Sequence, residues 1–104
     1  MEETLFREYF GNSPKLRILE YLITGRNLDY SLTDITKGAE VAWKTTLKLM
    51  PELVKSNVVV PTRTIGNAKL YKINEKSLVA KLIIQTFDNM LALSIPQEIK
   101  AKSK

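Results

Sequence analysis

The sequence predicts an α+β fold that is mainly helical, and two observations predict it. Between Ser31 and Ile73, helical spacing of apolar residues is interrupted by a short turn, resumes, and gives way to two β-rich runs joined by Gly66-Asn67. Basic residues flank that last turn. Helix, turn, helix and hairpin in this order predict a winged helix-turn-helix: a three-helix core, a β-hairpin wing and, here, an additional C-terminal helix.

Length and composition are those of one small globular domain. The chain has 104 residues, of which 44% are hydrophobic and 26% charged. No apolar run approaches the roughly 18 residues that span a bilayer. The first ten residues, MEETLFREYF, are acidic and lack the basic start and long apolar run of a secretory signal. We therefore expect a cytoplasmic protein with no membrane association.

The residue types that are missing exclude most catalytic chemistry. The sequence contains no cysteine and no histidine, which excludes disulfides, thiolate chemistry, Cys/His zinc sites and a histidine general base. No glycine-rich loop that could cradle a phosphate is present, and the carboxylates show no convergent arrangement. We expect neither an enzyme nor a cofactor, and no small-molecule effector is evident.

Positive charge is concentrated in one part of the chain. Residues 1–39 carry a net charge of −1, whereas residues 40–76 hold seven Lys or Arg and three acidic residues, a net of +4. Residues 77–104 carry +2. A basic bias on the predicted third helix and wing is what phosphate neutralisation requires, although a solvated basic surface would give the same count.

The first predicted core helix has clear end signals. Ser13 supplies a capping hydroxyl, and Pro14 fits the first helical position because its missing N–H has no partner there anyway. Apolar residues recur at helical spacing to Thr24, and Gly25 ends the helix. The connection over residues 26–31 alternates in polarity, so a short strand is possible there.

The helix-turn-helix follows this connection. Ser31 or Thr33 caps the second helix, which runs to Gly38-Ala39, and Asp34 adds a negative charge that favours its first turn. Residues 40–42 form the turn. We expect the third helix, called here the reading helix, from about residue 42 to 57.

The reading helix has two faces. Thr46, Leu49 or Met50, and Leu53 repeat at three- and four-residue intervals and define the buried face. Pro51 removes a backbone hydrogen bond and is expected to bend or break the helix. The residues left outward near the N-terminal end are Trp43, Lys44, Thr45, Leu47 and Lys48.

A hairpin and a last helix complete the chain. β-rich runs at 58–63 and 68–73 flank Gly66-Asn67, and Pro61 indicates a free strand edge. Asn74 is expected to cap the last helix, which Pro96 ends before a basic tail. These features divide the chain into residues 1–76, the winged-helix domain; 77–95, the dimerisation helix; and 96–104, the tail. The wide apolar stripe of the last helix predicts homodimer contacts through Leu78, Leu82, Ile83, Phe87, Met90 and Leu91.

The outward residues of the reading helix have the chemistry that major-groove binding needs. Lys44 and Lys48 are four residues apart, so they share a face and either side chain could donate to guanine or to phosphate. Thr45 could hydrogen-bond a base or the backbone. Trp43 could stack on a sugar or donate its indole N–H to phosphate, but it could equally cover the second helix or the wing as a structural residue.

The tip of the wing supplies a second candidate contact region. Arg63, Thr64, Asn67 and Lys69 surround the hairpin turn and could grip the minor groove or flanking phosphates. The alternative is that they are ordinary solvated turn residues.

Residues 10–74 resemble archaeal winged-helix transcriptional regulators of the MarR-like superfamily, and the last helix does so more loosely. The resemblance is carried by Gly11-Asn12-Ser13-Pro14, by Leu32-Thr33-Asp34-Ile35 and by the wing from Arg63 to Tyr71. It implies duplex DNA binding by a homodimer through the reading helix and the wing. Two positions depart from the family pattern: Glu40 stands where the turn usually has glycine, and Ala42 where it has a capping serine.

We also retain an interpretation from a different functional class. The same fold could serve as a protein-interaction module, as a subunit of a transcription or partition complex, with weak or no specific DNA binding. The apolar last helix would then contact a foreign partner.

Overall fold

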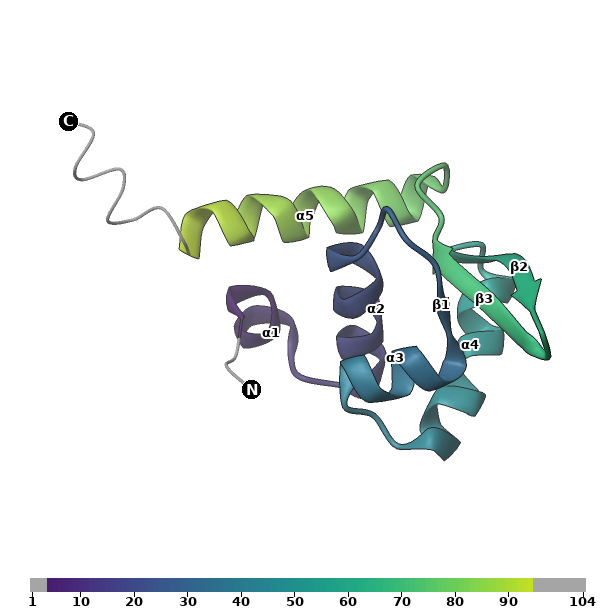
Figure 1. Cartoon of the computed structure of the whole chain (residues 1–104). Helices are drawn as coiled ribbons and strands as arrows, with labels where there is room; N and C mark the ends of the chain where they lie inside the picture. The colour runs from purple at the N-terminus through teal and green to yellow at the C-terminus, as the bar shows by residue number, and fades with distance from the viewer. Residues whose placement is uncertain (1–3, 95–104) are drawn as a thin grey trace.

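The computed structural model describes residues 4–94. Figure 1 shows the order of the elements, which are α1 (Leu5–Phe10), α2 (Pro14–Thr24), β1 (Tyr30–Ser31), α3 (Leu32–Ala39), α4 (Trp43–Lys55), β2 (Val59–Ile65), β3 (Ala68–Ile73) and α5 (Leu78–Ser94). The predicted winged helix-turn-helix with an additional C-terminal helix is confirmed.

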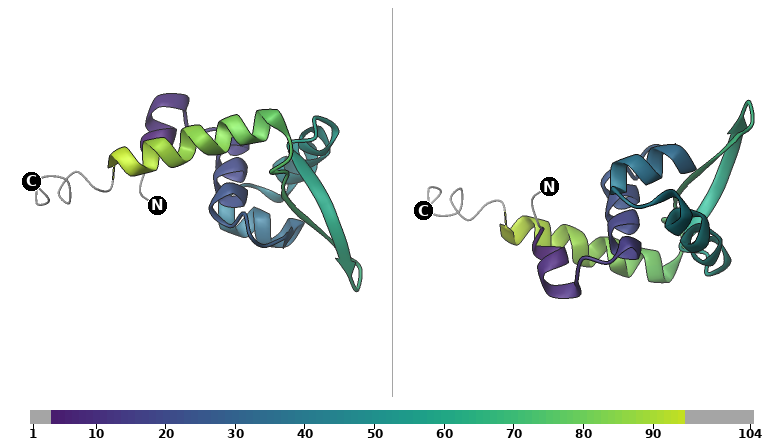
Figure 2. Two further views of the ribbon diagram at one scale, coloured as in Figure 1. Left: turned by 90° about the horizontal axis from the view of Figure 1, so that it is seen from above. Right: turned by 90° about the horizontal axis from the view of Figure 1, so that it is seen from below.

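Three helices form the centre of the molecule, and the hairpin projects from one side. Helices α2, α3 and α4 pack together, while α5 lies across α2 and reaches α1 at its far end (Figure 1). The views from above and below show the hairpin of β2 and β3 extending well beyond the helices (Figure 2). The layout therefore separates the face made by α4 and the wing from the helical face made by α1 and α5.

One apolar core joins all of these elements. Helix α4 contributes its predicted buried face, with Thr46, Met50 and Leu53 at 0–2% exposure. The largest fully buried side chains are Ile18, Leu22, Ile23, Ile35, Met50, Ile73, Val59 and Thr46. Because these residues come from α2, α3, α4 and both long strands, α4 is held in place by the whole core rather than by its immediate neighbour.

Helices α2 and α3 both begin at side-chain caps. The Ser13 hydroxyl accepts a hydrogen bond from the Leu16 N–H at 3.1 Å, directly before Pro14. Of the two candidate caps for α3, Ser31 is the one used: it accepts from the Asp34 N–H, and the Asp34 carboxylate accepts from the Ser31 N–H, each at 3.1 Å. This reciprocal pair is a capping box.

The turn between α3 and α4 is fixed from two sides. The Arg17 guanidinium on α2 donates to the carbonyl oxygens of Ala39 and Glu40, at 3.1 and 3.2 Å. The Thr36 hydroxyl donates to the hydroxyl of buried Thr46 at 2.9 Å, which ties α3 to α4. These bonds satisfy polar groups at the end of α3 and fix the direction in which α4 leaves the turn.

Glu40 adopts the left-handed conformation that the missing glycine would favour. Its φ is 57° and its ψ is 50° at the C-cap of α3. A residue with a Cβ is strained there by roughly 1–2 kcal/mol. At the other side of the turn, Ala42 begins α4 without any side-chain cap. Both departures from the family pattern therefore have a structural cost.

Of the two expected effects of Pro51, a bend or a break in the reading helix, the break does not occur. Helix α4 is continuous from Trp43 to Lys55 with Pro51 inside it. Met50, directly before the proline, and Leu53, two residues after it, are both buried in the core. Their burial keeps the two halves aligned although the proline cannot donate to the Leu47 carbonyl.

The sheet has the order β1-β3-β2 and is antiparallel throughout. The short strand predicted before the second helix exists as β1, whose Tyr30 pairs with Tyr71 of β3. Strand β2 is at one edge, as Pro61 indicated, and its register shifts between Pro61 and Thr64. Leu70 is buried, while Tyr71 is half-buried against the core.

Helix α5 begins later than the sequence indicated. Its cap is Ser77, whose hydroxyl accepts from the Ala80 N–H at 3.2 Å, and not Asn74. The Asn74 side chain accepts from the Lys76 N–H and donates to the Asn57 carbonyl, so it shapes the preceding turn instead. The proposed helix stop at Pro96 and the tail 96–104 lie outside the described residues.

Helix α1 covers part of the face of α5 that was predicted to pair. The Phe6 and Phe87 rings meet edge-to-face, with centroids 5.5 Å apart. Phe87 is 6% exposed, so it belongs to the core of a single chain and has little surface left for a second copy. Buried Arg7 of α1 forms an ion pair with Glu20 of α2, which anchors α1.

A second ion pair fixes α5 against the loop that follows α2. Both terminal nitrogens of Arg26 donate to the Asp88 carboxylate, at 2.9 and 2.7 Å. The neighbouring Arg26 guanidinium lowers the pKa of Asp88.

Within the described residues, no helix has the length and apolar character needed to cross a membrane.

Replacing Glu40 with glycine should stabilise the fold. Glu40→Gly removes the left-handed strain at little cost beyond the extra freedom of the unfolded chain, for a net gain of about 0.5–1 kcal/mol. Urea unfolding followed by far-UV circular dichroism measures the change. Lys37→Gly is the matched control: it makes the same kind of replacement inside α3 and should destabilise by about 1 kcal/mol. Equal destabilisation by both variants would contradict the strain.

Candidate nucleic-acid interface

The outward face of α4 is where the sequence placed it. Lys44 and Lys48 are exposed, and Trp43 is 50% exposed. Thr45 is half-buried and Leu47 remains exposed. The opposite face of the helix is the buried one already described, so α4 presents an uncovered cationic side while its other side anchors it.

No carboxylate lies in the N-terminal two-thirds of α4. From Val41 to Pro51 the only charged residues are Lys44 and Lys48, and the first acid of the helix is Glu52, in its C-terminal half. Two lysines without nearby counter-ions on their own helix produce a local positive potential. An anionic partner would find this end of α4 favourable.

Trp43 lies at the opening between α4 and the wing. With Ile65, Asn67, Ala68 and Lys69 of the hairpin it lines a cleft of about 500 Å³. Half of the side chain stays open to solvent, so it does not close this cleft. This position is compatible with both uses that the sequence left open for Trp43, a DNA contact or cover for the second helix and the wing.

Arg63 is already engaged by a carboxylate. Its Nε donates to Asp29 at 3.0 Å and its Nη2 donates to the same carboxylate at 3.2 Å. The Thr62 hydroxyl also donates to Asp29, at 2.5 Å. Asp29 precedes β1, so these bonds tie the base of the wing to the connection after α2. Arg63 therefore differs from the other predicted wing contacts, because part of its charge is neutralised.

The remaining wing residues are free to meet a ligand from either side. Thr64, Asn67 and Lys69 are all exposed, and Thr64 pairs with Lys69 across the hairpin. Gly66 has a φ of +61°, which the tight turn at the tip requires and which glycine adopts without strain. The tip is thus a narrow projection that carries these polar side chains together with exposed Ile65.

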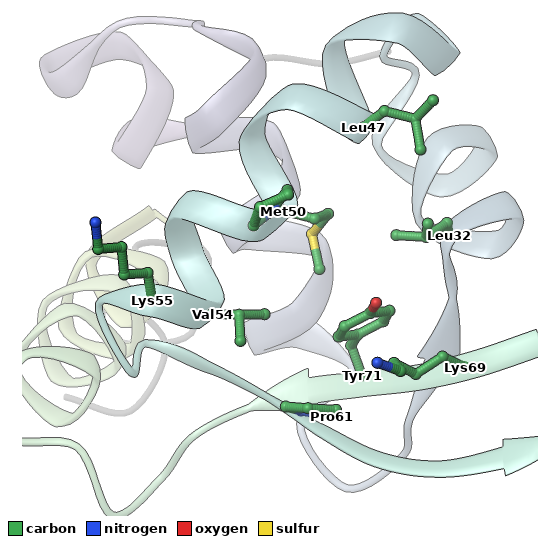
Figure 3. Close-up of a pocket in the computed structure, with 9 residues that line it drawn as sticks. Leu32, Leu47, Met50, Val54, Lys55, Pro61, Lys69 and Tyr71 are labelled. Carbon is green, nitrogen blue, oxygen red and sulfur yellow. The ribbon is translucent and has the colours of Figure 1, made fainter.

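An inner pocket separates the wing from the middle of α4. Figure 3 shows Leu47, Met50 and Val54 of α4 on one side and Tyr71 and Lys69 of β3 on the other. The pocket has a volume of about 360 Å³ and is mostly apolar. Leu32 and Lys69 line both this pocket and the outer cleft, so they stand between the two hollows.

Two residues that shape the interface were not singled out from the sequence. In the sequence, Arg17 stands out only as one charge of the first core helix. Asp29 is only one residue of the connection that follows it. A signal existed for Arg17, because a long cation beside the apolar stripe of a core helix often reaches a polar group on a neighbouring element. No sequence signal connects Asp29 to Arg63, which lies 34 residues away.

Comparison with known proteins supports the fold. No family model and no curated protein matches the sequence. The structure is similar to Sso10a-2, a DNA-binding protein from Sulfolobus solfataricus, with a TM-score of 0.54 and 19% identity over 85% of this chain and 92% of the other. It is also similar to MepR, a transcription regulator of the Staphylococcus aureus multidrug efflux pump MepA (TM-score 0.56, 14% identity, 88% and 70% covered).

A third solved structure is also similar. A mutant of Lactococcus lactis ZitR in apo form gives a TM-score of 0.61 at 17% identity, with 91% of this chain and 73% of the other covered. At identities this low, the likeness establishes the winged-helix fold and nothing further about this chain.

The Asp29 carboxyl should titrate below its ordinary value. The Arg63 guanidinium, followed by the Thr62 hydroxyl, lowers the pKa of Asp29. A lowered folded-state pKa adds stability above about pH 3.9, the unfolded value, and this stability is lost as the pH falls through the folded-state pKa. Carbon-detected NMR titration should show the pKa of Asp29 rising toward 3.9 in Arg63→Gln but staying low in Arg63→Lys. An unchanged pKa in Arg63→Gln would refute the pairing.

Proposed function

We propose that this protein is a sequence-specific regulator that binds double-stranded DNA, of the winged-helix kind that includes the MarR-like superfamily. One observation carries the proposal: α4 is anchored by one face and leaves Lys44 and Lys48 uncovered on the other, next to an exposed hairpin. In this arrangement α4 enters the major groove and the wing lies over the adjacent backbone.

The charges around the interface support a polyanionic partner. Lys44, Lys48 and Lys69 are all exposed on α4 and the wing. Of the nearby acids, Asp29 is paired with Arg63 and Asp34 is bound to the Ser31 N–H, whereas Glu40 is exposed in the turn before α4. The negative charge of Asp29 and Asp34 is therefore partly compensated within the protein, whereas the positive charge of the lysines is left for phosphate.

Exposed apolar residues of α5 support a homodimer. Leu78 is 72% exposed and Leu82 55%, one helical turn apart on the same side of the helix, and Leu91 is also exposed. Ile83 and Met90 are half-buried and flank this surface, whereas Phe87 is taken by the core. Pairing of α5 with the same helix of a second copy would place two reading helices about one turn of DNA apart, on a pseudo-palindrome.

A DNA-bound regulator would act in the cytoplasm.

Removing the two lysines of α4 should weaken DNA binding. Lys44→Ala with Lys48→Ala is expected to reduce the magnitude of the slope of log K against log salt by about 2, because each phosphate contact contributes about 0.9. Duplexes selected from random DNA by the wild-type protein serve as the ligand, and fluorescence anisotropy measures affinity between about 50 and 200 mM salt.

The control variant is Lys76→Ala with Lys81→Ala, which removes the same charge at the start of α5. Its salt slope should stay close to that of the wild type. If the α4 variant and the control lose affinity equally, or if neither does, α4 is not the helix that binds DNA.

Charges on the exposed side of α5 should prevent pairing. Leu78→Glu with Leu82→Glu would desolvate two carboxylates in the interface, so sedimentation at tens of micromolar should give a monomer where the wild type gives a dimer. Leu28→Glu, at an exposed leucine outside α5, is the control for charge alone. A wild-type protein that sediments as a monomer at this concentration rules out the dimer.

The protein-interaction module remains a second candidate because of the same exposed apolar residues. It predicts a stable complex with a foreign partner through α5, together with weak DNA binding that shows no sequence preference. Failure to enrich any duplex from random DNA, with a hetero-complex captured through α5, would favour this function over the first.

A further inference from the structure

The outer cleft between α4 and the wing has apolar walls at an exposed place. Trp43 forms one wall, and Ile65 and Ala68 of the hairpin tip form the other. Ile65 is 56% exposed and Trp43 is 50% exposed, so neither side chain is buried by the fold itself. Within residues 61–65 every residue is exposed, which means that this end of β2 has no core to cover.

The rim of the cleft is polar and contains no carboxylate. Lys69 contributes an ammonium group, Asn67 an amide, and Ser31 and Thr33 hydroxyl groups from the start of α3. The carboxylate of neighbouring Asp34 is turned back to the Ser31 N–H, at 3.1 Å. A ligand in the cleft would therefore meet apolar walls and a rim of hydrogen-bond donors with one positive charge.

A DNA strand presents this pattern in complementary form. Its backbone alternates an apolar deoxyribose with an anionic phosphate, and donors such as lysine, asparagine and serine commonly bind the phosphate oxygens. When α4 occupies the major groove and the wing lies over the adjacent minor groove, one strand has to pass between them. The outer cleft is the space between these two elements.

We propose that the outer cleft holds the sugar–phosphate backbone of one DNA strand, with Trp43 and Ile65 packed against deoxyribose and Lys69, Asn67, Ser31 and Thr33 directed at the flanking phosphates. The inference rests on the proposed function and extends it in two ways. It assigns DNA contacts to Ile65, Ser31 and Thr33, and of the two DNA contacts open to Trp43 it selects packing against a sugar over donation to a phosphate.

The proposal separates two components of affinity. Lysine–phosphate contacts release counter-ions and therefore weaken as salt rises, whereas burial of an apolar side chain against a sugar does not. Loss of Ile65 or Trp43 should lower affinity by a similar factor at every salt concentration. Loss of Lys69 should change the salt slope.

The experiment uses duplexes selected from random DNA by the full-length wild-type protein. Ile65→Ala and Trp43→Ala should each bind about fivefold to tenfold more weakly with an unchanged salt slope. Trp43→Phe, which keeps an apolar wall, should bind nearly as tightly as wild type. Lys69→Ala should reduce the magnitude of the slope by about 1. Leu28→Ala, at an exposed leucine outside the cleft, should leave affinity and slope unchanged.

Trp43 also reports on the cleft directly, because it is the only tryptophan in the sequence. Its fluorescence should become protected from acrylamide when wild-type protein or Lys69→Ala is saturated with duplex. Because every substituted position is exposed, the variants should keep the wild-type circular dichroism spectrum, which is recorded alongside.

The possible failures are distinguishable. If the wild-type protein binds duplex DNA but Trp43 stays open to acrylamide, or if Ile65→Ala and Trp43→Ala bind like wild type, the strand does not occupy the cleft and this inference is overturned alone. If the wild-type protein enriches no duplex, the proposed function fails and the inference fails with it.

Discussion

The interface depends on how the turn between α3 and α4 is held. Arg17 reaches from α2 to the carbonyls of Ala39 and Glu40, and the Thr36 hydroxyl bonds to buried Thr46 one turn into α4. A charged donor to a carbonyl and a partly buried hydroxyl pair are both costly to break without replacement. Helix α4 thus leaves the turn in one direction, and the side of the helix that faces solvent is decided before any ligand is present.

Local signals predicted most of the elements. A capping hydroxyl followed by proline gave the start of α2, and Gly66-Asn67 gave the hairpin, because both act within a few residues. The errors arose where two local signals competed. Asn74 and Ser77 are both good caps, and the helix starts at the second because Ala80 is the first residue of α5 to be buried. Pro51 does not break α4, because Met50 and Leu53 on either side of it are buried in the core.

Helical periodicity predicted the part of the candidate site that lies on α4, and no more. The spacing of the buried residues identified the outward side of α4 correctly. The Asp29–Arg63 pair could not be foreseen, because it forms only when the hairpin folds back beside the connection after α2. The prediction that Phe87 lies on a dimer surface was wrong for a related reason. Its spacing along the helix fits a dimer surface and a core equally well, and it belongs to the core because Phe6 of α1 packs against it.

Strand β2 has a further consequence for how copies of this chain associate. It is an open edge of the sheet, and such edges readily add strands from neighbouring molecules and nucleate aggregates. Pro61 removes one donor from this edge, and the register shift before Thr64 twists the strand out of a flat ladder. On the other edge, β1 spans two residues and offers little to extend. The hairpin can therefore project far into solvent without recruiting a second hairpin.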